Sequence, residues 1–146
     1  MSASPRTIED FIRENGTYMT NTLGSSMRPL FRTHRDAVIL SRPEREILRY
    51  DVVLYKTPRG YLLHRVVGIK GDVLIIRGDN TFVNELIPRS EVIAVMTAFN
   101  RKGKRRSVED ASYRLYSRLW NFIYPIRFVL RKLRSFLGRI KRKLFK

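Results

Sequence analysis

The sequence predicts a mainly β protein, in which a small, coiled β-domain is followed by a basic amphipathic helical tail. Five short apolar runs of strand length, separated by turn-forming residues, predict the β-domain. Beyond residue 100 the apolar residues recur every three or four positions, which is the period of an amphipathic helix. A chain of 146 residues can bury one modest core. We therefore expect a domain over residues 1–100 and a tail over residues 101–146.

The first element that we expect is a short helix near the N-terminus. Thr7 and Asp10 have the spacing of a capping box, in which each side chain bonds the backbone N–H of the other residue. Gly16 ends this helix. Residues 17–25 then lead to a bend, because Pro29 prevents a regular continuation of the chain.

Short runs of apolar and β-branched residues predict the strands. Polar residues 41–50 form a loop or an extended edge, residues 57–60 a hairpin turn and residues 70–72 the next turn. The five expected strands cover residues 37–40, 51–56, 61–69, 73–77 and 92–99.

The tail begins with a basic linker at residues 101–106. Residues 107–110 (Ser-Val-Glu-Asp) have the spacing of a second capping box and are expected to open a helix. Pro125 interrupts or kinks this helix. From residue 126 to residue 144, apolar positions alternate with Lys and Arg at helical spacing, with Gly138 as a further point of interruption.

The positive charge of the chain is concentrated in the tail. The formal net charge is +17, of which residues 101–146 carry +14 and the first 100 residues only +3. Such a tail indicates an anionic partner. A helix over residues 107–145 could lie on an anionic membrane surface, with Tyr116, Trp120 and Tyr124 at interfacial depth. The alternatives are packing against the β-domain and, less favoured because no nucleic-acid-binding module is present, contact with nucleic acid.

Composition also bears on cofactors and location. The chain has no cysteine and only two histidines, so we expect no disulfide, no structural zinc site and no other cofactor. The N-terminus lacks the apolar segment of a signal peptide, and no long uncharged apolar stretch predicts a transmembrane helix. We expect a cytoplasmic protein, with a peripheral position on the inner face of the membrane as a further option.

Three segments stand in a fixed order and carry residues suited to catalysis. Ser26 lies in Gly-Ser-Ser-Met-Arg-Pro, His64 in Leu-His-Arg-Val-Val-Gly, and Asp79 in Arg-Gly-Asp-Asn. A serine nucleophile needs a neighbouring base, and that base needs a group that orients it. The other histidine, His34, lies in a charged loop and is interpreted as a surface residue.

In their order and spacing these segments, within residues 20–98, resemble the signal-peptidase and LexA-repressor group of serine peptidases. In that group the nucleophile lies in Ser-Met-x-Pro, the base lies on a later strand, and a Gly-Asp-Asn box follows. Histidine stands here where the common bacterial enzymes carry lysine, so the closer resemblance is to the endoplasmic-reticulum type of signal peptidase. The resemblance implies a LexA-like fold and hydrolysis through an acyl-enzyme, with the substrate bound as an extended strand.

The resemblance assigns Ser26 as the nucleophile and His64 as the general base. Lys56 is a competing candidate for the base, because a buried lysine serves in many members of the group. The third member is either Asp79, in the Gly-Asp-Asn box, or Glu85, a few residues beyond it. Asp79 has a structural alternative, in which its carboxylate caps the turn and braces the Ser26 loop.

The residues around Ser26 are expected to bind the substrate. Gly24 lets a substrate backbone come close, because glycine has no Cβ. Ser25 could line an oxyanion site together with the backbone N–H of Ser26, and Met27 belongs to the same segment. Many bacterial signal peptidases carry a hydroxyl residue at the position of Gly24, so the oxyanion site here would depend more on backbone groups.

The predicted function is therefore that of a serine endopeptidase that cleaves a precursor, leader or signal-type peptide in trans. Self-cleavage of the LexA kind is not expected, because only 25 residues precede Ser26 and they hold no DNA-binding helix pair. The alternative is a non-catalytic LexA-like regulator or adaptor that binds DNA or a membrane through its basic tail.

Overall fold

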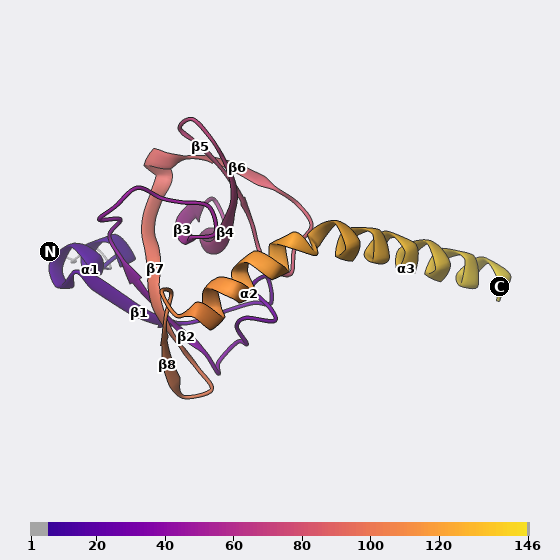
Figure 1. The fold of residues 1–146 in the computed structure, drawn as a ribbon, viewed down its shortest axis with the longest axis horizontal. Helices are drawn as coiled ribbons and strands as arrows, with labels where there is room; N and C mark the ends of the chain where they lie inside the picture. Colours follow the sequence, from indigo (N-terminus) through magenta and orange to yellow (C-terminus); the bar gives the residue numbers. More distant parts are fainter. Residues whose placement is uncertain (1–5, 146) are drawn as a thin grey trace, which may run out of the picture.

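The computed structural model describes residues 6–145 and contains one antiparallel sheet with three α-helices (Figure 1). The helices are α1 (Ile8–Asn15), α2 (Ala111–Phe122) and α3 (Tyr124–Leu144), and a 3₁₀ turn covers Arg89–Glu91. Eight strands are found in the described residues: β1 (Thr17–Asn21), β2 (Ala37–Ser41), β3 (Val52–Thr57), β4 (Gly60–Lys70), β5 (Val73–Arg77), β6 (Glu85–Pro88), β7 (Val92–Arg101) and β8 (Lys104–Ser107).

The sheet has the order β1-β2-β7-β3-β4-β5-β6, and β8 pairs with the end of β7. The register shifts at Ile39/Leu40, at Leu54/Tyr55 and between Val66 and Gly68. Such bulges increase the local twist of a strand. The sheet therefore coils around itself, so that loops distant in the sequence meet at one side of it (Figure 1).

The coiled sheet buries a core on both of its faces. Along β3, Val52 and Leu54 contribute to one apolar cluster, whereas Val53 and Tyr55 contribute to the other. The first cluster also takes in Ile12 of α1. Because both faces of β3 are buried over its first four residues, these residues are all apolar rather than alternating with polar ones.

The expected N-terminal helix and the five expected strands are confirmed. In α1, the hydroxyl of Thr7 accepts the N–H of Asp10 at 3.2 Å, and the Asp10 carboxylate accepts the N–H of Thr7 at 3.0 Å. Gly16 closes the helix with a φ of +76°. The expected strands correspond to β2, β3, β4, β5 and β7.

Three expectations about the tail are wrong. Residues 101–106 form no linker but the end of a β-hairpin, in which β8 pairs with β7. The box at residues 107–110 does not cap a helix, because Asp110 bonds the N–H of Ser107 in the turn before α2. Gly138 does not interrupt α3, which runs through to Leu144. The expected boundary at residue 100 thus falls inside a hairpin.

The two C-terminal helices differ in how they contact the domain. Tyr113 and Ser117 of α2 are buried against it, whereas α3 leads away from the domain to the C-terminus (Figure 1). Pro125 lies in the first turn of α3, after a break at Ile123. None of the helices in residues 6–145 is both long and apolar enough to cross a membrane.

Candidate active site

The loop that carries Ser26 connects β1 to β2 and is held by its own carbonyl groups. Gly24 has a φ of +77°, a conformation that favours glycine, and its carbonyl accepts the hydroxyl of Thr33 at 2.6 Å. The side chain of Met27 is buried in the core, and its carbonyl accepts the N–H of Phe31 at 3.0 Å. Ser26 itself is only partly buried, on a loop that the core anchors.

The Gly-Asp-Asn box lies directly against this loop. The backbone N–H of Asn80 donates to the carbonyl of Ser26 at 2.7 Å. The side-chain amide of Asn80 donates to the carbonyl of Ser25 at 3.2 Å, and Ser25 is exposed. Two segments more than 50 residues apart are thereby joined, and the box, through Asn80, braces the serine loop.

Gly78 is the point at which the serine loop meets His64. A Cβ placed on Gly78 would lie 2.7 Å from the carbonyl oxygen of Ser26 and 3.1 Å from Nε2 of His64. The Ser26 carbonyl and the His64 imidazole therefore border the same small space next to Gly78. This space stays open only because glycine has no side chain. The structure thus brings the backbone of Ser26 close to the imidazole of His64, and no hydrogen bond joins the Ser26 hydroxyl to Nε2.

His64 lies on β4 and is only 6% exposed. In the part of the chain that the structure describes, its Nε2 is the one buried side-chain polar atom without a hydrogen-bond partner. Burial lowers the pKa of His64 below its ordinary value, although the charges of Glu85 and Asp79 oppose the shift. The imidazole is therefore neutral at pH 7 and has the protonation state of a general base.

Tyr55 occupies the other side of the imidazole ring. Its hydroxyl oxygen lies 3.0 Å from Nδ1 of His64, and its O–H donates to the carboxylate of Glu85. Burial, together with the bond to Glu85, raises the pKa of Tyr55 well above its ordinary value, so the phenol keeps its proton. Because that one proton is given to Glu85, the phenol oxygen accepts from His64, which assigns the ring proton to Nδ1. Nε2 is then left with a free lone pair.

Glu85 therefore interacts with His64 mainly through Tyr55. Its Oε2 lies 3.8 Å from Nδ1 of His64, a distance longer than a hydrogen bond. A chain of three side chains, Glu85, Tyr55 and His64, thus leads from the half-exposed carboxylate to the space beside Ser26.

Asp79 has a different set of partners. Its carboxylate accepts two bonds from Arg65, both at 2.8 Å, and one from the hydroxyl of Tyr116 at 2.9 Å. Its backbone carbonyl accepts the indole N–H of Trp120 and the guanidinium of Arg127, each at 2.8 Å. Asp79 makes no hydrogen bond to His64; it fixes the box and attaches the C-terminal helices to it.

Arg65, the residue after His64, is fully buried and completes this attachment. It donates to Tyr113 at 3.1 Å and to Ser117 at 2.9 Å, both of which belong to α2. A buried arginine needs an acidic partner, and this requirement was a signal for the pairing with Asp79 that the sequence analysis did not use. Tyr55 was not predicted as a site residue; its hydroxyl follows three apolar residues at the start of β3.

The remaining candidates lie away from this arrangement. Lys56 is exposed, and its ammonium group lies 5.4 Å from the ring centre of Tyr61. A lysine that serves as a general base is buried, so the exposed position of Lys56 does not suit that role. His34 is exposed in a loop with a φ of +61°.

An apolar cavity of about 310 Å³ lies beside Ser26. It is bordered by β1 and the loop after it on one side and by residues 61–63 of β4 on the other. Within the described sheet, β1 pairs only with β2, and the stretch of β4 before Arg65 pairs only with β3. Two strand edges with unpaired backbone groups therefore face the cavity, which suits the binding of an extended peptide.

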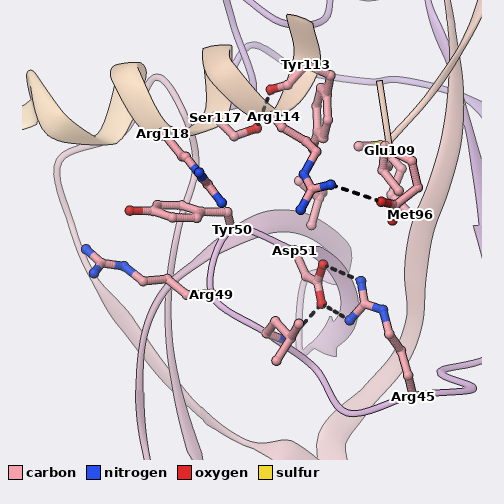
Figure 2. Close-up of a pocket in the computed structure, with 13 residues that line it drawn as sticks. Arg45, Arg49, Tyr50, Asp51, Met96, Glu109, Tyr113, Arg114, Ser117 and Arg118 are labelled. Carbon is pink, nitrogen blue, oxygen red and sulfur yellow. Dashed lines mark hydrogen bonds and ion pairs between the residues drawn. The ribbon is translucent and has the colours of Figure 1, made fainter. Parts of the chain in front are cut away.

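A second cavity, of about 360 Å³, lies between α2 and the loop before β3 (Figure 2). Its acidic side chains are paired: Asp51 accepts two bonds from Arg45 at 2.8 and 2.9 Å, and Glu109 lies 3.5 Å from Arg114. Neither Ser26 nor His64 lines it. The polar side chains that line this cavity belong to the contact between α2 and the domain.

No known protein family and no curated protein matches the chain in sequence. Within residues 6–145, no three histidine or acidic side chains gather in a way that could hold a metal ion.

Proposed function

We propose that this chain is a serine endopeptidase of the signal-peptidase type, closest to the endoplasmic-reticulum form, with Ser26 as nucleophile and His64 as general base. One observation carries the proposal: the buried, neutral His64 presents a lone pair without a partner to the space that the Ser26 loop borders. A buried polar atom without a partner is costly and is tolerated where it has a function. In this proposal the function of Nε2 is to accept the hydroxyl proton of Ser26.

The geometry supports the following reaction. Ser26 Oγ attacks the peptide carbonyl carbon as Nε2 of His64 takes the hydroxyl proton, and the C–O double bond becomes a single bond to an oxyanion. His64 then gives that proton to the leaving amine, the C–N bond breaks, and an ester on Ser26 remains. Water attacks the ester with His64 again as base, which releases the acid and restores the serine hydroxyl.

The chain from Glu85 through Tyr55 orients the base and stabilises the imidazolium. In the neutral state, the Nδ1 proton of His64 is held by the phenol oxygen of Tyr55. When Nε2 gains a proton, the positive charge lies 3.8 Å from the carboxylate of Glu85. Attraction between these charges favours proton transfer from serine.

The oxyanion is stabilised by backbone N–H groups of the serine loop. The carbonyls of Gly24, Ser25, Ser26 and Met27 are all engaged in hydrogen bonds that fix the peptide planes. Since the N–H of a trans peptide points opposite to its carbonyl, these bonds also fix the N–H directions. A preorganised donor of this kind is typically worth ~3 kcal/mol of transition-state stabilisation.

The substrate is a peptide in extended conformation, such as a precursor or leader segment, cleaved in trans. It pairs with the edges of β1 and β4 and places a small or medium apolar side chain in the cavity of about 310 Å³.

A fluorophosphonate probe, which reacts with activated serines, tests the proposal. We expect labelling of the purified protein, and loss of labelling in Ser26→Ala and in His64→Ala. Two matched controls, Ser90→Ala and His34→Asn, should label at the rate of the unaltered protein, because both residues are exposed and lie outside the candidate site. Asparagine is chosen for position 34 because it tolerates a positive φ. Labelling that persists in Ser26→Ala would contradict the assignment.

A further inference from the structure

The C-terminal helices carry a long apolar stripe that the domain does not cover. At about 100° per residue, its members fall within an arc of roughly 120° that continues from α2 onto α3. Their side chains are between 38% and 78% exposed. The stripe consists of Leu115, Leu119, Phe122, Ile126, Val129, Leu130, Leu133, Phe136, Leu137, Ile140 and Leu144.

The stripe faces away from the domain. Tyr113 and Ser117 are buried on the opposite side of α2, and on that same side the indole of Trp120 bonds the carbonyl of Asp79. Tyr124, at the start of α3, bonds the carbonyl of Phe82 of the domain at 3.3 Å. The aromatic residues expected at interfacial depth (Tyr116, Trp120 and Tyr124) therefore attach the helices to the domain, and the residues of the stripe are left on the free side.

Charge restricts what can cover the stripe. Helix α3 contains eight Lys and Arg residues and no Asp or Glu, and its basic residues occupy the part of the helix outside the apolar arc. The helix is about 30 Å long at 1.5 Å per residue. Its partner must offer both an apolar layer and negative charge over that length.

A second copy of this chain would bring two such cationic helices together, which like-charge repulsion opposes. Nucleic acid would neutralise the basic side chains and leave the apolar arc in water. The surface of an anionic bilayer satisfies both requirements, because acyl chains accept the apolar face while headgroups neutralise the cations. We propose that α2 and α3 lie along the surface of an anionic membrane, with the β-domain on the aqueous side.

This attachment also holds the candidate active site close to the membrane surface. The guanidinium of Arg127, in the second turn of α3, donates to the carbonyl of Asp79, and that of Arg131 lies 4.5 Å from the ring centre of Phe82. The segment that braces the Ser26 loop is thus fastened to the membrane-lying helix. The apolar cavity beside Ser26 is thereby held near substrates at the membrane surface. The proposal goes beyond the peptidase activity and does not depend on it.

Flotation of the full chain with lipid vesicles tests the proposal. We expect at least about tenfold tighter binding to vesicles that contain phosphatidylglycerol than to vesicles of phosphatidylcholine alone, and weaker binding as salt is added. A variant with Leu133→Gln, Phe136→Gln and Leu137→Gln keeps the charge and should lose binding at least about tenfold. The matched control Leu48→Gln removes an exposed apolar residue of the domain and should bind as the unaltered chain does.

Three results would overturn the proposal. The first is equal binding to both kinds of vesicle, or to neither. The second is full vesicle binding by the triple glutamine variant. Charge alone would then explain the binding, and nucleic acid would become the favoured partner of the helix. The third is a dimer in solution that the triple variant abolishes, which would assign the stripe to a second copy. Circular dichroism checks that each variant is folded, and the altered side chains are all exposed, so no core contact is removed.

Discussion

The phenol oxygen of Tyr55 lies 3.0 Å from Nδ1 of His64, and the same hydroxyl donates to Glu85. A phenol has a single proton, so this arrangement makes Tyr55 an acceptor toward the histidine. The imidazole is thereby held in the tautomer whose Nε2 can accept the proton of Ser26. An aspartate performs this task in the Ser-His-Asp triad, whereas here a tyrosine stands between the base and the carboxylate.

The first prediction concerns this relay. Tyr55→Phe keeps the ring in the core but removes the acceptor for Nδ1, so both tautomers of His64 become accessible. We expect the second-order rate constant of fluorophosphonate labelling to fall roughly 10- to 100-fold, which is less than the roughly 10²–10⁴-fold effect of a general base, because His64 itself remains.

Tyr18→Phe is the control for this change, because Tyr18 lies on β1 and contributes no atom to the relay. An unchanged labelling rate in Tyr55→Phe, with the variant shown to be folded, would remove Tyr55 from the mechanism.

The second prediction concerns pH. Burial lowers the pKa of His64. In a plot of labelling rate against pH, the midpoint of the acid limb should therefore lie below pH ~6.5, the ordinary histidine value. The charge of Glu85 opposes this shift, so Glu85→Gln should move the limb to still lower pH. An acid limb that moves upward in Glu85→Gln would contradict the electrostatic role of this carboxylate.

The same shift affects stability. The native state binds the His64 proton more weakly than the unfolded state does, so protonation favours unfolding. The contribution of neutral His64 is complete above the unfolded pKa of ~6.5 and is lost as the pH falls through the lower native pKa. Thermal unfolding of the unaltered protein and of His64→Gln should therefore diverge in pH dependence only on the acid side.

The third prediction concerns Gly78. A methyl group at this position would lie 2.7 Å from the carbonyl of Ser26 and 3.1 Å from Nε2 of His64, and a backbone oxygen cannot give way easily. Gly78→Ala should therefore abolish labelling, because the serine loop and the base are forced apart. Gly138→Ala is the matched control, since a methyl group there meets no atom within 4 Å. Normal labelling of Gly78→Ala would show that the two groups do not react across this space.

The fourth prediction separates Asp79 from Glu85. Asp79→Ala leaves the fully buried Arg65 without its counter-charge and should destabilise the fold by about 3–5 kcal/mol, measured by denaturant unfolding. Glu109→Ala removes an exposed ion pair and should leave stability nearly unchanged. If Asp79→Ala instead lost labelling and kept full stability, Asp79 rather than Glu85 would serve the base.

The fold was predictable where burial determines the sequence pattern. Strands β2, β3 and β5 each begin with four consecutive apolar residues, and α1 carries its capping residues within one turn. Strands β1, β6 and β8 were missed because they are short edge strands whose residues are largely exposed. What makes such a segment a strand is pairing with a neighbour from elsewhere in the chain, which local sequence does not report.

The candidate site was predictable to a similar extent. Ser26 and His64 stand in recognisable segments, and the structure brings both to Gly78. The role of Tyr55 depends on the register of β3 with β4, in which Val53 pairs with His64 and Tyr55 is its diagonal neighbour on the same face. Such a register emerges only when the strands pair, so the relay to Glu85 could not be read from spacing.

The most direct test of the proposal that His64 activates Ser26 as a nucleophile is to locate the fluorophosphonate adduct by mass spectrometry of the digested protein. We expect one phosphonyl group per chain, on Ser26, that forms in the unaltered protein and is absent from His64→Ala. Absence of an adduct in the unaltered protein, with and without phosphatidylglycerol vesicles, would contradict it. An adduct on Ser25, or one that forms equally well without His64, would contradict it as well.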